Sequence, residues 1–225
     1  MKSIHKLAAI AVAMAFTLNA QADINIGVMV STTGPGATLG IPKQNTVKLW
    51  PTEIAGQKLN VTVLNDASDT TTAAKNATKL ISEDNVDVIV GPSLTPTSLA
   101  ALDVAAKATT PMISLAGGDS IIYPADGPRH WAFRMAAPAA VAVNFALDDM
   151  LSKGVKKVGV IALATSFGED YTKALEKAAP AKGIKVVAVE RYNQTDTSVT
   201  AQTLRLLSAQ PDAVYVMSSG TPGAL

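Results

Sequence analysis

The residues that could do chemistry in this sequence are hydroxyls and glycines, and they gather in short segments. Residues 31–40, 91–98 and 113–120 each combine Ser or Thr with Gly. Hydroxyl groups and exposed backbone amides donate hydrogen bonds to an anionic group such as a carboxylate. We therefore expect these segments to bind a small solute, and we do not expect the chain to be an enzyme.

The groups that usually carry out catalysis are scarce. The sequence has no cysteine and two histidines, which excludes disulfides, a thiolate metal site and a cysteine nucleophile. The second histidine, His130, stands between Arg129 and Trp131 in a Pro/Gly-rich stretch, where a surface side chain is expected rather than a general base. Hydrolases and metalloenzymes are disfavoured, and no metal or cofactor is expected.

Gly34, Gly36 and Gly40 suggest one alternative, a Rossmann-type oxidoreductase that binds a nucleotide. Their spacing is G-x-G-x-x-x-G, one residue longer than the fingerprint that holds a pyrophosphate, and Leu39 stands where the third glycine should be. Asp66 would supply the later acidic residue of such an enzyme. This alternative remains open, and adding nicotinamide nucleotides to the protein would test it.

The first residues indicate export. Two lysines and a histidine precede an uncharged apolar run over residues 7–18, and a pattern of small residues two apart ends at Ala22. This predicts a signal peptide over residues 1–22, cleaved before Asp23, and a periplasmic mature protein. A membrane anchor needs about 20 apolar residues and no comparable run recurs, so no membrane insertion is expected after cleavage.

The charge balance disfavours nucleic acid as a partner. Lys and Arg number 19 and Asp and Glu number 18, for a net charge of +1, whereas a nucleic-acid-binding domain carries a basic patch or stripe. The chain beyond the signal is long enough for two domains of about 100 residues each.

Short β-branched runs alternate with segments of helical periodicity. The runs are almost continuously apolar, which is typical of parallel strands covered on both faces. A helix is expected over residues 70–84, with Asp69 placed to cap its first amides. This order predicts a doubly wound α/β fold. The expected strands cover residues 24–30, 59–64, 86–90, 157–163, 185–189 and 213–217, and the other expected helices cover residues 98–107, 138–152, 171–181 and 199–208.

Two glycines mark repeated helix exits. Gly154 and Gly183 stand in similar Lys-Gly-Val/Ile-Lys segments, where each can take the left-handed conformation that ends a helix. A domain crossing is expected near residues 134–142, after a Gly/Pro-rich stretch. The expected lobes are residues 23–136 and residues 137–225.

The segments that follow strands are the places to look for a site, because open α/β sheets bind ligands beyond the carboxyl ends of their strands. Thr95 lies near a helix start, whose amides suit a carboxylate. The alternative is that Thr97 or Ser98 only caps that helix.

Three further candidates, Ala116, Gly117 and Gly118, follow the next strand. Paired glycines let backbone amides approach a ligand closely, although the same residues also suit an ordinary turn.

The second half offers two more strand ends. Phe167 lies at a strand-to-helix corner, where it forms either an apolar wall over a solute or part of the core. Ser219 and Gly220 belong to a small, hydroxyl-bearing strand end over residues 217–222.

Taken together and in this order, these segments resemble the branched-chain amino-acid-binding protein family of type I periplasmic binding proteins, the receptors of ABC importers. No single piece is specific, but the set is, because it spreads over nearly all of the mature chain. The matching pieces are residues 31–40, 65–70, 86–92, 111–114, 131–134, 166–169 and 211–215.

The resemblance implies a two-lobed receptor that closes by a hinge around an amino acid or related carboxylate. It implies that Thr95 and the amides of Gly117 and Gly118 hold the carboxylate, that Leu39 contacts the side chain and that Phe167 forms the wall. The expected receptor is a monomer that delivers its ligand to an inner-membrane ABC permease. A ligand-sensing receptor of the same fold is the alternative.

The sequence also departs from the family. Relatives often have a hydroxyl residue in place of Gly118 and a tyrosine in place of Phe167. They also continue past Leu225, so the resemblance implies a truncated chain with an incomplete second lobe. The acidic residue that relatives use against the ligand's ammonium is then expected beyond the last residue.

Overall fold

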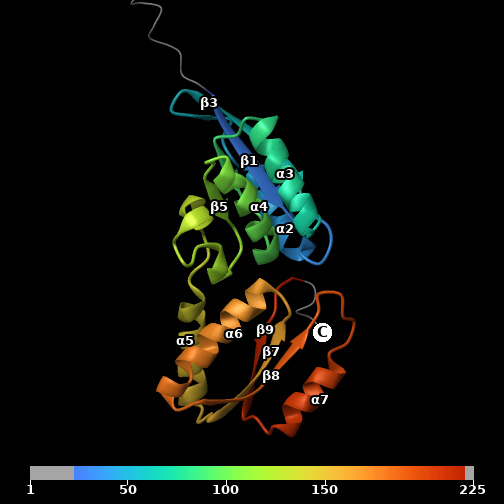
Figure 1. The fold of residues 1–225 in the computed structure, drawn as a ribbon, viewed down its shortest axis with the longest axis vertical. Coiled ribbons are helices and arrows are strands. Elements are labelled where there is room, and N and C mark those ends of the chain that lie inside the picture. The colour runs from blue at the N-terminus through green and yellow to red at the C-terminus, as the bar shows by residue number, and fades with distance from the viewer. Residues whose placement is uncertain (1–22, 221–225) are drawn as a thin grey trace, which may run out of the picture.

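The computed structural model describes residues 23–220, so the expected signal peptide lies outside the described residues. The described chain forms two α/β halves, one above the other in Figure 1, each built on its own sheet. Within this part of the chain no helix is both long and apolar enough to cross a bilayer.

The first half contains a six-stranded sheet in the order β2-β3-β1-β4-β5-β6. Strand β1 pairs in parallel with β3 and β4, β5 and β6 extend the parallel part, and only β2 runs antiparallel to its neighbour. The strands are β1 (Ile24–Val30), β2 (Glu53–Ile54), β3 (Gln57–Asn65), β4 (Val88–Val90), β5 (Met112–Ser114) and β6 (Ala132–Arg134). The helices are α2 (Ala37–Val47), α3 (Thr70–Ser82) and α4 (Thr95–Lys107), followed by the short 3-10 helices η1 (Asp119–Ile121) and η2 (Gly127–Trp131).

The second half contains a three-stranded parallel sheet in the order β8-β7-β9. Its strands are β7 (Lys157–Leu163), β8 (Lys185–Tyr192) and β9 (Ala213–Met217). The helices are α5 (Ala139–Ser152), α6 (Ser166–Ala178) and α7 (Thr200–Ser208), with the 3-10 helix η3 (Pro180–Lys182). In both halves the chain alternates between strand and helix, as the sequence predicts.

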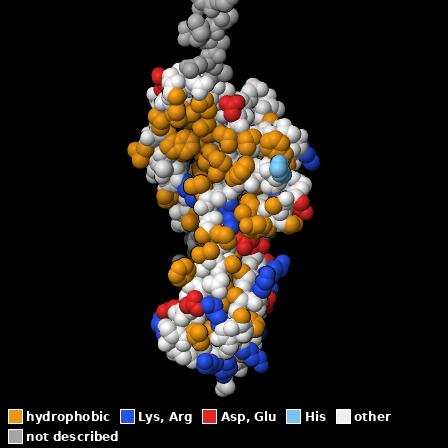
Figure 2. All heavy atoms as spheres, turned by 90° about the vertical axis from the view of Figure 1, so that its left-hand side faces the viewer, with side chains coloured by type: hydrophobic (Ala, Val, Ile, Leu, Met, Phe, Trp, Pro, Cys, Tyr) orange, Lys and Arg blue, Asp and Glu red, His pale blue; other side chains and the backbone are white. Residues whose placement is uncertain are grey.

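Each half has a core of its own. In the first half Met29, Leu80 and Ile89 are fully buried with residues of α3 and α4 around them. In the second half Leu147 and Leu175 pack against β7. Figure 2 shows apolar side chains gathered on one side of the first half, whereas Lys and Arg side chains lie at the far end of the second half.

Most sequence-based elements are confirmed. Strands β1, β7 and β9 have the expected bounds, and Asp69 caps α3 through a hydrogen bond from the Thr72 amide. Gly154 and Gly183 have φ angles of 78° and 68°, the left-handed conformation expected at these helix exits.

Three helix starts differ from expectation. Helix α4 begins at Thr95 and α6 at Ser166, three and five residues earlier than expected, and α2 begins at Ala37, inside the glycine-rich segment of residues 31–40. The glycines and Pro42 hide α2 in the sequence, because both residue types weaken a helix. Packing stabilises it instead: a Cβ on Gly40 would lie 2.0 Å from the Ser31 carbonyl oxygen, so the helix rests directly on the end of β1.

The Asp69 cap leads to a prediction about acid stability. Its Oδ1 accepts hydrogen bonds of 2.7 Å from the Thr72 amide and 2.8 Å from the Thr72 hydroxyl, and these hold the pKa of Asp69 below its ordinary value of 3.8. A lowered carboxyl pKa stabilises the fold above the unfolded pKa, and this stabilisation is lost as the pH falls through the folded pKa. We expect Asp69→Ala to lower the urea midpoint at neutral pH and to lose less further stability than the wild type on acidification.

Urea unfolding followed by circular dichroism at neutral pH and at about pH 3 checks this expectation. Asp103→Ala, an exposed aspartate inside α4, is the matched control. Equal midpoints for Asp69→Ala and wild type at neutral pH would contradict the role of the cap.

Candidate functional site between the two halves

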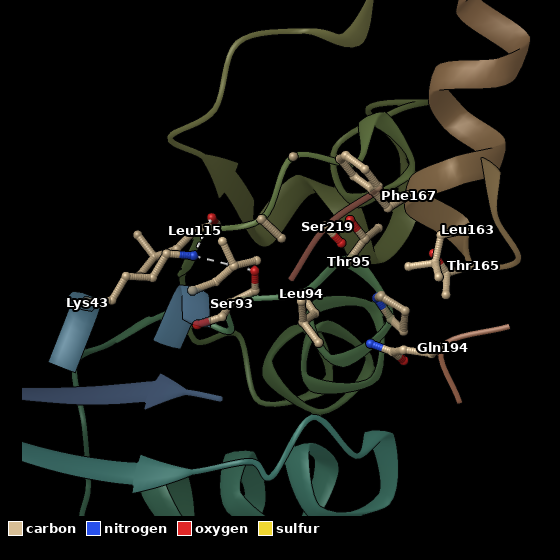
Figure 3. A pocket seen from close by; sticks show the side chains of 14 residues that line it. Lys43, Ser93, Leu94, Thr95, Leu115, Leu163, Thr165, Phe167, Gln194 and Ser219 are labelled. Atoms are coloured by element: carbon tan, nitrogen blue, oxygen red, sulfur yellow. Dashed lines mark hydrogen bonds between the residues drawn. The ribbon is translucent and has the colours of Figure 1, made fainter. Parts of the chain in front are cut away.

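A pocket of about 140 Å³ lies between the two halves. Its lining residues in the first half lie after the carboxyl ends of β1, β4 and β5. Those in the second half lie at or after the carboxyl ends of β7, β8 and β9, in the lower half of Figure 1. Figure 3 shows these side chains pointing toward a shared space. The first half contributes Leu39, Lys43, Ser93, Leu94, Thr95, Pro96, Leu115, Ala116 and Gly117, and the second half contributes Leu163, Thr165, Phe167, Gln194 and Ser219.

Six of the eight residues expected at the site line this pocket: Leu39, Thr95, Ala116, Gly117, Phe167 and Ser219. Gly118 does not line the pocket. Its amide donates a 3.1 Å hydrogen bond to Oγ1 of Thr95, which does line it. Gly220 lies beside the first half instead, since a Cβ there would meet the Pro35 carbonyl oxygen at 2.4 Å. Gly118 therefore supports the pocket residue Thr95, and Gly220 lies at the boundary between the two halves.

Thr95 is the first residue of α4, and its side chain is almost fully buried. The hydroxyl accepts from Gly118, so its own proton remains available to a pocket occupant. The amides of Thr95 and Thr97 have no acceptor inside the helix, because the first intrahelical bond is made by the Ser98 amide. The start of α4, where Leu94, Thr95 and Pro96 line the pocket, thus keeps backbone donors that the helix does not use.

The alternative that Thr97 or Ser98 caps α4 is wrong. The residue before the helix is Leu94, and no side chain caps it. The Thr97 hydroxyl donates to the Leu94 carbonyl, and the Ser98 hydroxyl bonds the Ser114 hydroxyl at 2.8 Å. Ser98 thus joins α4 to the end of β5, Thr97 bonds locally, and neither side chain caps the first amides of α4.

Helix α6 mirrors this arrangement from the second half. Thr165 precedes the helix without capping it by its side chain, and the first intrahelical bond is made by the Glu169 amide. The hydroxyl oxygens of Thr165 and Ser166 are buried and have no partner among the described residues. Helices α4 and α6 contact each other across the boundary, so two helix N-termini, each equivalent to about half a positive charge, meet at the pocket.

Phe167 forms a wall of the pocket against the first half. A Cβ on Gly117 would lie 3.2 Å from a carbon of the Phe167 ring, so the ring passes close to the Gly117 backbone. Its other neighbour is Tyr171, with ring centroids 4.7 Å apart. Because the ring is only half-buried, it packs between the halves and does not belong to either core.

Four amides of the glycine-rich segment after β1 are already occupied by hydrogen bonds within the protein. The amide of Gly36 donates to Ser68 Oγ, and those of Ala37, Leu39 and Gly40 donate to backbone carbonyls of the same segment. These four amides are therefore not available to an anion or to the pyrophosphate of the oxidoreductase alternative. The segment instead begins α2, which carries Leu39 and Lys43 one turn apart to the pocket.

Lys43 is a pocket residue that the sequence interpretation missed. Its Nζ lies 3.2 Å from the Leu115 carbonyl oxygen and 3.5 Å from that of Ser93 (Figure 3). Burial lowers the pKa of Lys43, and the negative charge of Asp66 partly opposes this effect. The signal in the sequence was the i, i+4 spacing from Leu39, which places both residues on one helix face only if α2 begins before Leu39.

The pocket lining has a pronounced charge asymmetry. Lys43 is its one charged side chain, and no carboxylate stands among the lining residues that the structure describes. Four leucines and Phe167 are among the uncharged lining residues. In charge and shape, the described walls suit an anionic group attached to an apolar body.

Acid, base and metal chemistry have no support in the described residues. His130 is exposed and packs edge-on against Trp131, with ring centroids 6.2 Å apart. Between Asp23 and Gly220 no group of three or more His, Asp or Glu residues is arranged to hold a metal ion.

Two polar contacts join the halves beside the pocket. Asp170 Oδ2 on α6 accepts from the amide of Ser120 at 2.9 Å and from its hydroxyl at 2.7 Å. Asp119 Oδ1 pairs with Arg134 at 2.6 Å and also accepts from the Ala139 amide at the start of α5. These contacts hold the halves in the arrangement that encloses the pocket.

Solved structures share this fold over most of the chain. An extracellular ligand-binding receptor from Rhodopseudomonas palustris HaA2 is 42% identical, with a TM-score of 0.87, and the match covers 91% of this chain and 57% of that one. A solute-binding protein of an ABC transporter from R. palustris BisB5, solved with 3,4-dihydroxybenzoic acid, is 27% identical with a TM-score of 0.78, over 86% of this chain and 54% of that one. The architecture is therefore the two-lobed fold of type I periplasmic binding proteins, as expected.

The sequence comparisons agree with this class. A curated Leu/Ile/Val-binding protein of Rhizobium johnstonii is 25% identical over 92% of this chain and 58% of its own length. The family described as periplasmic binding protein matches residues 23–225. The chain belongs to this family, whose members are binding proteins and not enzymes, and it spans just over half the length of the relatives it matches.

The position of Gly118 generates a prediction. A Cβ there would lie 2.3 Å from Thr95 Cγ2 and 2.8 Å from Asp170 Oδ2. Both side chains accept hydrogen bonds, Thr95 from the Gly118 amide and Asp170 from Ser120, so neither can move aside without weakening them. We expect Gly118→Ala to destabilise the protein by about 1–3 kcal/mol, because overpacking also strains the bond to Thr95. Gly117→Ala, which meets one ring carbon at 3.2 Å, is the milder comparison. Thermal unfolding measures both, and a melting temperature for Gly118→Ala equal to that of the wild type would refute the close packing.

Proposed function

We propose that this protein binds a small carboxylate in the pocket between its two lobes and delivers it to an inner-membrane ABC permease. The observation that carries the proposal is the pocket itself, lined by strand ends of both lobes and by the N-termini of α4 and α6. Helix N-termini stabilise anions through free amides and the helix dipole. Membership of the periplasmic binding protein family supports transport as the purpose of binding.

Two classes of carboxylate deserve direct comparison. An amino acid is favoured by the similarity to a Leu/Ile/Val-binding protein. An aromatic acid is favoured by the relative solved with 3,4-dihydroxybenzoic acid, and the half-buried Phe167 ring offers such a ligand a surface to stack on. Thr95, Ala116 and Gly117 are the proposed carboxylate contacts, with Gly118 holding Thr95 in position and Leu39 facing the apolar body.

The experiment is a calorimetric titration of the purified protein with a panel of amino acids, aromatic acids and sugars. Saturable heat from a carboxylate, and none from sugars, is the expected result. Uptake of the radiolabelled solute by cells with and without the protein then tests delivery. Heat from sugars and from no carboxylate would overturn the proposed ligand class.

The Phe167 wall makes the pocket geometry testable. Phe167→Ala removes the aromatic surface over the pocket, and we expect it to weaken carboxylate binding about tenfold or more, since losing a packed ring costs at least one to two kcal/mol. Phe145→Ala, at a side chain on α5 that is 75% exposed, is the control and should bind as the wild type does. Calorimetry measures both, and an unchanged dissociation constant for Phe167→Ala would exclude the ring from the site.

A further inference from the structure

Arg134 is a buried cation that contacts the backbone of a pocket residue. It is the last residue of β6, at one edge of the first sheet, and its side chain is only 1% exposed. Its Nη1 donates a 3.0 Å hydrogen bond to the carbonyl oxygen of Gly117, which lines the pocket. Arg134 itself does not belong to the lining, so any effect that it has on a solute passes through other residues.

The peptide unit between Gly117 and Gly118 is bonded at both ends. Its carbonyl oxygen accepts from Arg134, and its N–H donates at 3.1 Å to Oγ1 of Thr95. A trans peptide unit is planar, so its carbonyl and its N–H point in opposite directions. Because the unit is rigid, the contact that fixes the carbonyl also fixes the direction of the N–H.

The N–H of Gly118 restricts the hydroxyl of Thr95. A threonine hydroxyl has one proton to donate and two lone pairs that accept, and Gly118 occupies one of the lone pairs. The hydroxyl proton must therefore point away from the Gly118 N–H. Thr95 is almost fully buried at the first position of α4 and lines the pocket. This bond thus favours the orientation in which the hydroxyl donates to an occupant of the pocket.

Arg134 also holds the segment that crosses from the first half to the second. Its Nε donates at 3.1 Å to the carbonyl oxygen of Ala136, and its Nη1 pairs at 2.6 Å with Oδ1 of Asp119. The same carboxylate oxygen accepts from the amide of Ala139, the first residue of α5. The donors of a guanidinium lie in a rigid, planar fork. One rigid group therefore bonds both the crossing segment and the carbonyl of Gly117.

Resting on the proposed binding function, we propose that Arg134 is a positioning residue for solute binding, which orients the Thr95 hydroxyl toward the bound carboxylate through the peptide unit of Gly117 and Gly118. It acts without contacting the solute. Because the same guanidinium bonds the crossing segment, the direction of this hydroxyl is tied to the connection between the lobes.

A double-mutant cycle measured by calorimetry tests the proposal, with L-leucine and 3,4-dihydroxybenzoate as the probes. Wild type, Arg134→Gln, Thr95→Val and the double variant are compared. The glutamine amide ends near the place of the arginine Nε, so Gly117 loses its donor. We expect Arg134→Gln to weaken the binding of whichever probe binds by about fivefold or more when the Thr95 hydroxyl is present, and by less than about twofold in the Thr95→Val background.

Arg129→Lys is the matched control. Arg129 is half-buried and donates from Nε to the Ser120 carbonyl oxygen at 2.7 Å, close in sequence to Gly118 but outside this peptide unit. This variant should bind as the wild type does in both backgrounds. Arg134→Lys keeps a cation beside Asp119, and it takes the place of Arg134→Gln in the cycle if circular dichroism shows that Arg134→Gln does not fold.

Amide hydrogen exchange in the solute-free protein, followed by NMR, separates positioning from general loosening. We expect Arg134→Gln to speed exchange at the Gly118 amide by about tenfold relative to the amides of β1. An unchanged rate at Gly118, or an equal rise throughout β1, overturns the proposal.

The binding data give two further outcomes that are distinct from each other. An equal loss of affinity from Arg134→Gln with and without the Thr95 hydroxyl overturns the positioning role but leaves the proposed binding function intact. Absence of binding by the wild type to both probes and to every carboxylate of the wider panel rejects the proposed function, and this inference with it.

Discussion

The pocket depends on how closely two helices approach the strands that precede them. In the first half a Cβ on Gly40 would lie 2.0 Å from the Ser31 carbonyl oxygen, and in the second half a Cβ on Gly168 would lie 2.0 Å from that of Leu163. Only a residue without a side chain allows this contact. It brings α2 and α6 against the ends of β1 and β7, and so sets the position of Lys43 from one lobe and Phe167 from the other.

Parallel pairing then determines what these helices face. Because all strands of a parallel sheet end at one edge, the segments after β4 and β5 lie beside the end of β1, and those after β8 and β9 lie beside the end of β7. Two such edges face each other across the boundary. A small anion can thus meet hydroxyls, amides and one ammonium from segments that are more than a hundred residues apart in the chain.

The positions of most strands, and the bounds of β1, β7 and β9, were predictable, because β-branched apolar runs have few other interpretations. Thr95 and Phe167 could be found for a related reason: they follow strands, and strand ends mark the binding edge of an α/β sheet. The start of helix α2 could not be found, since Gly40 and Pro42 oppose helix formation locally and packing against Ser31 overrides that preference. Lys43 was missed as well, because a lysine shows no sign of burial in the sequence unless the helix face that carries it is known. The hydrogen bond from the Gly118 amide could not be predicted either, because its acceptor, Thr95, lies 23 positions away in the sequence.

The contact between Ser120 and Asp170 has a consequence for affinity that does not depend on the solute. Separating the lobes exchanges two hydrogen bonds to this carboxylate for water, so the pair sets part of the free-energy difference between closed and open protein. Apparent affinity scales with the fraction of molecules already in the competent arrangement. Under the proposed function, substitutions at this pair would therefore change how tightly the protein holds its cargo, while the choice of cargo would stay with the residues that line the pocket.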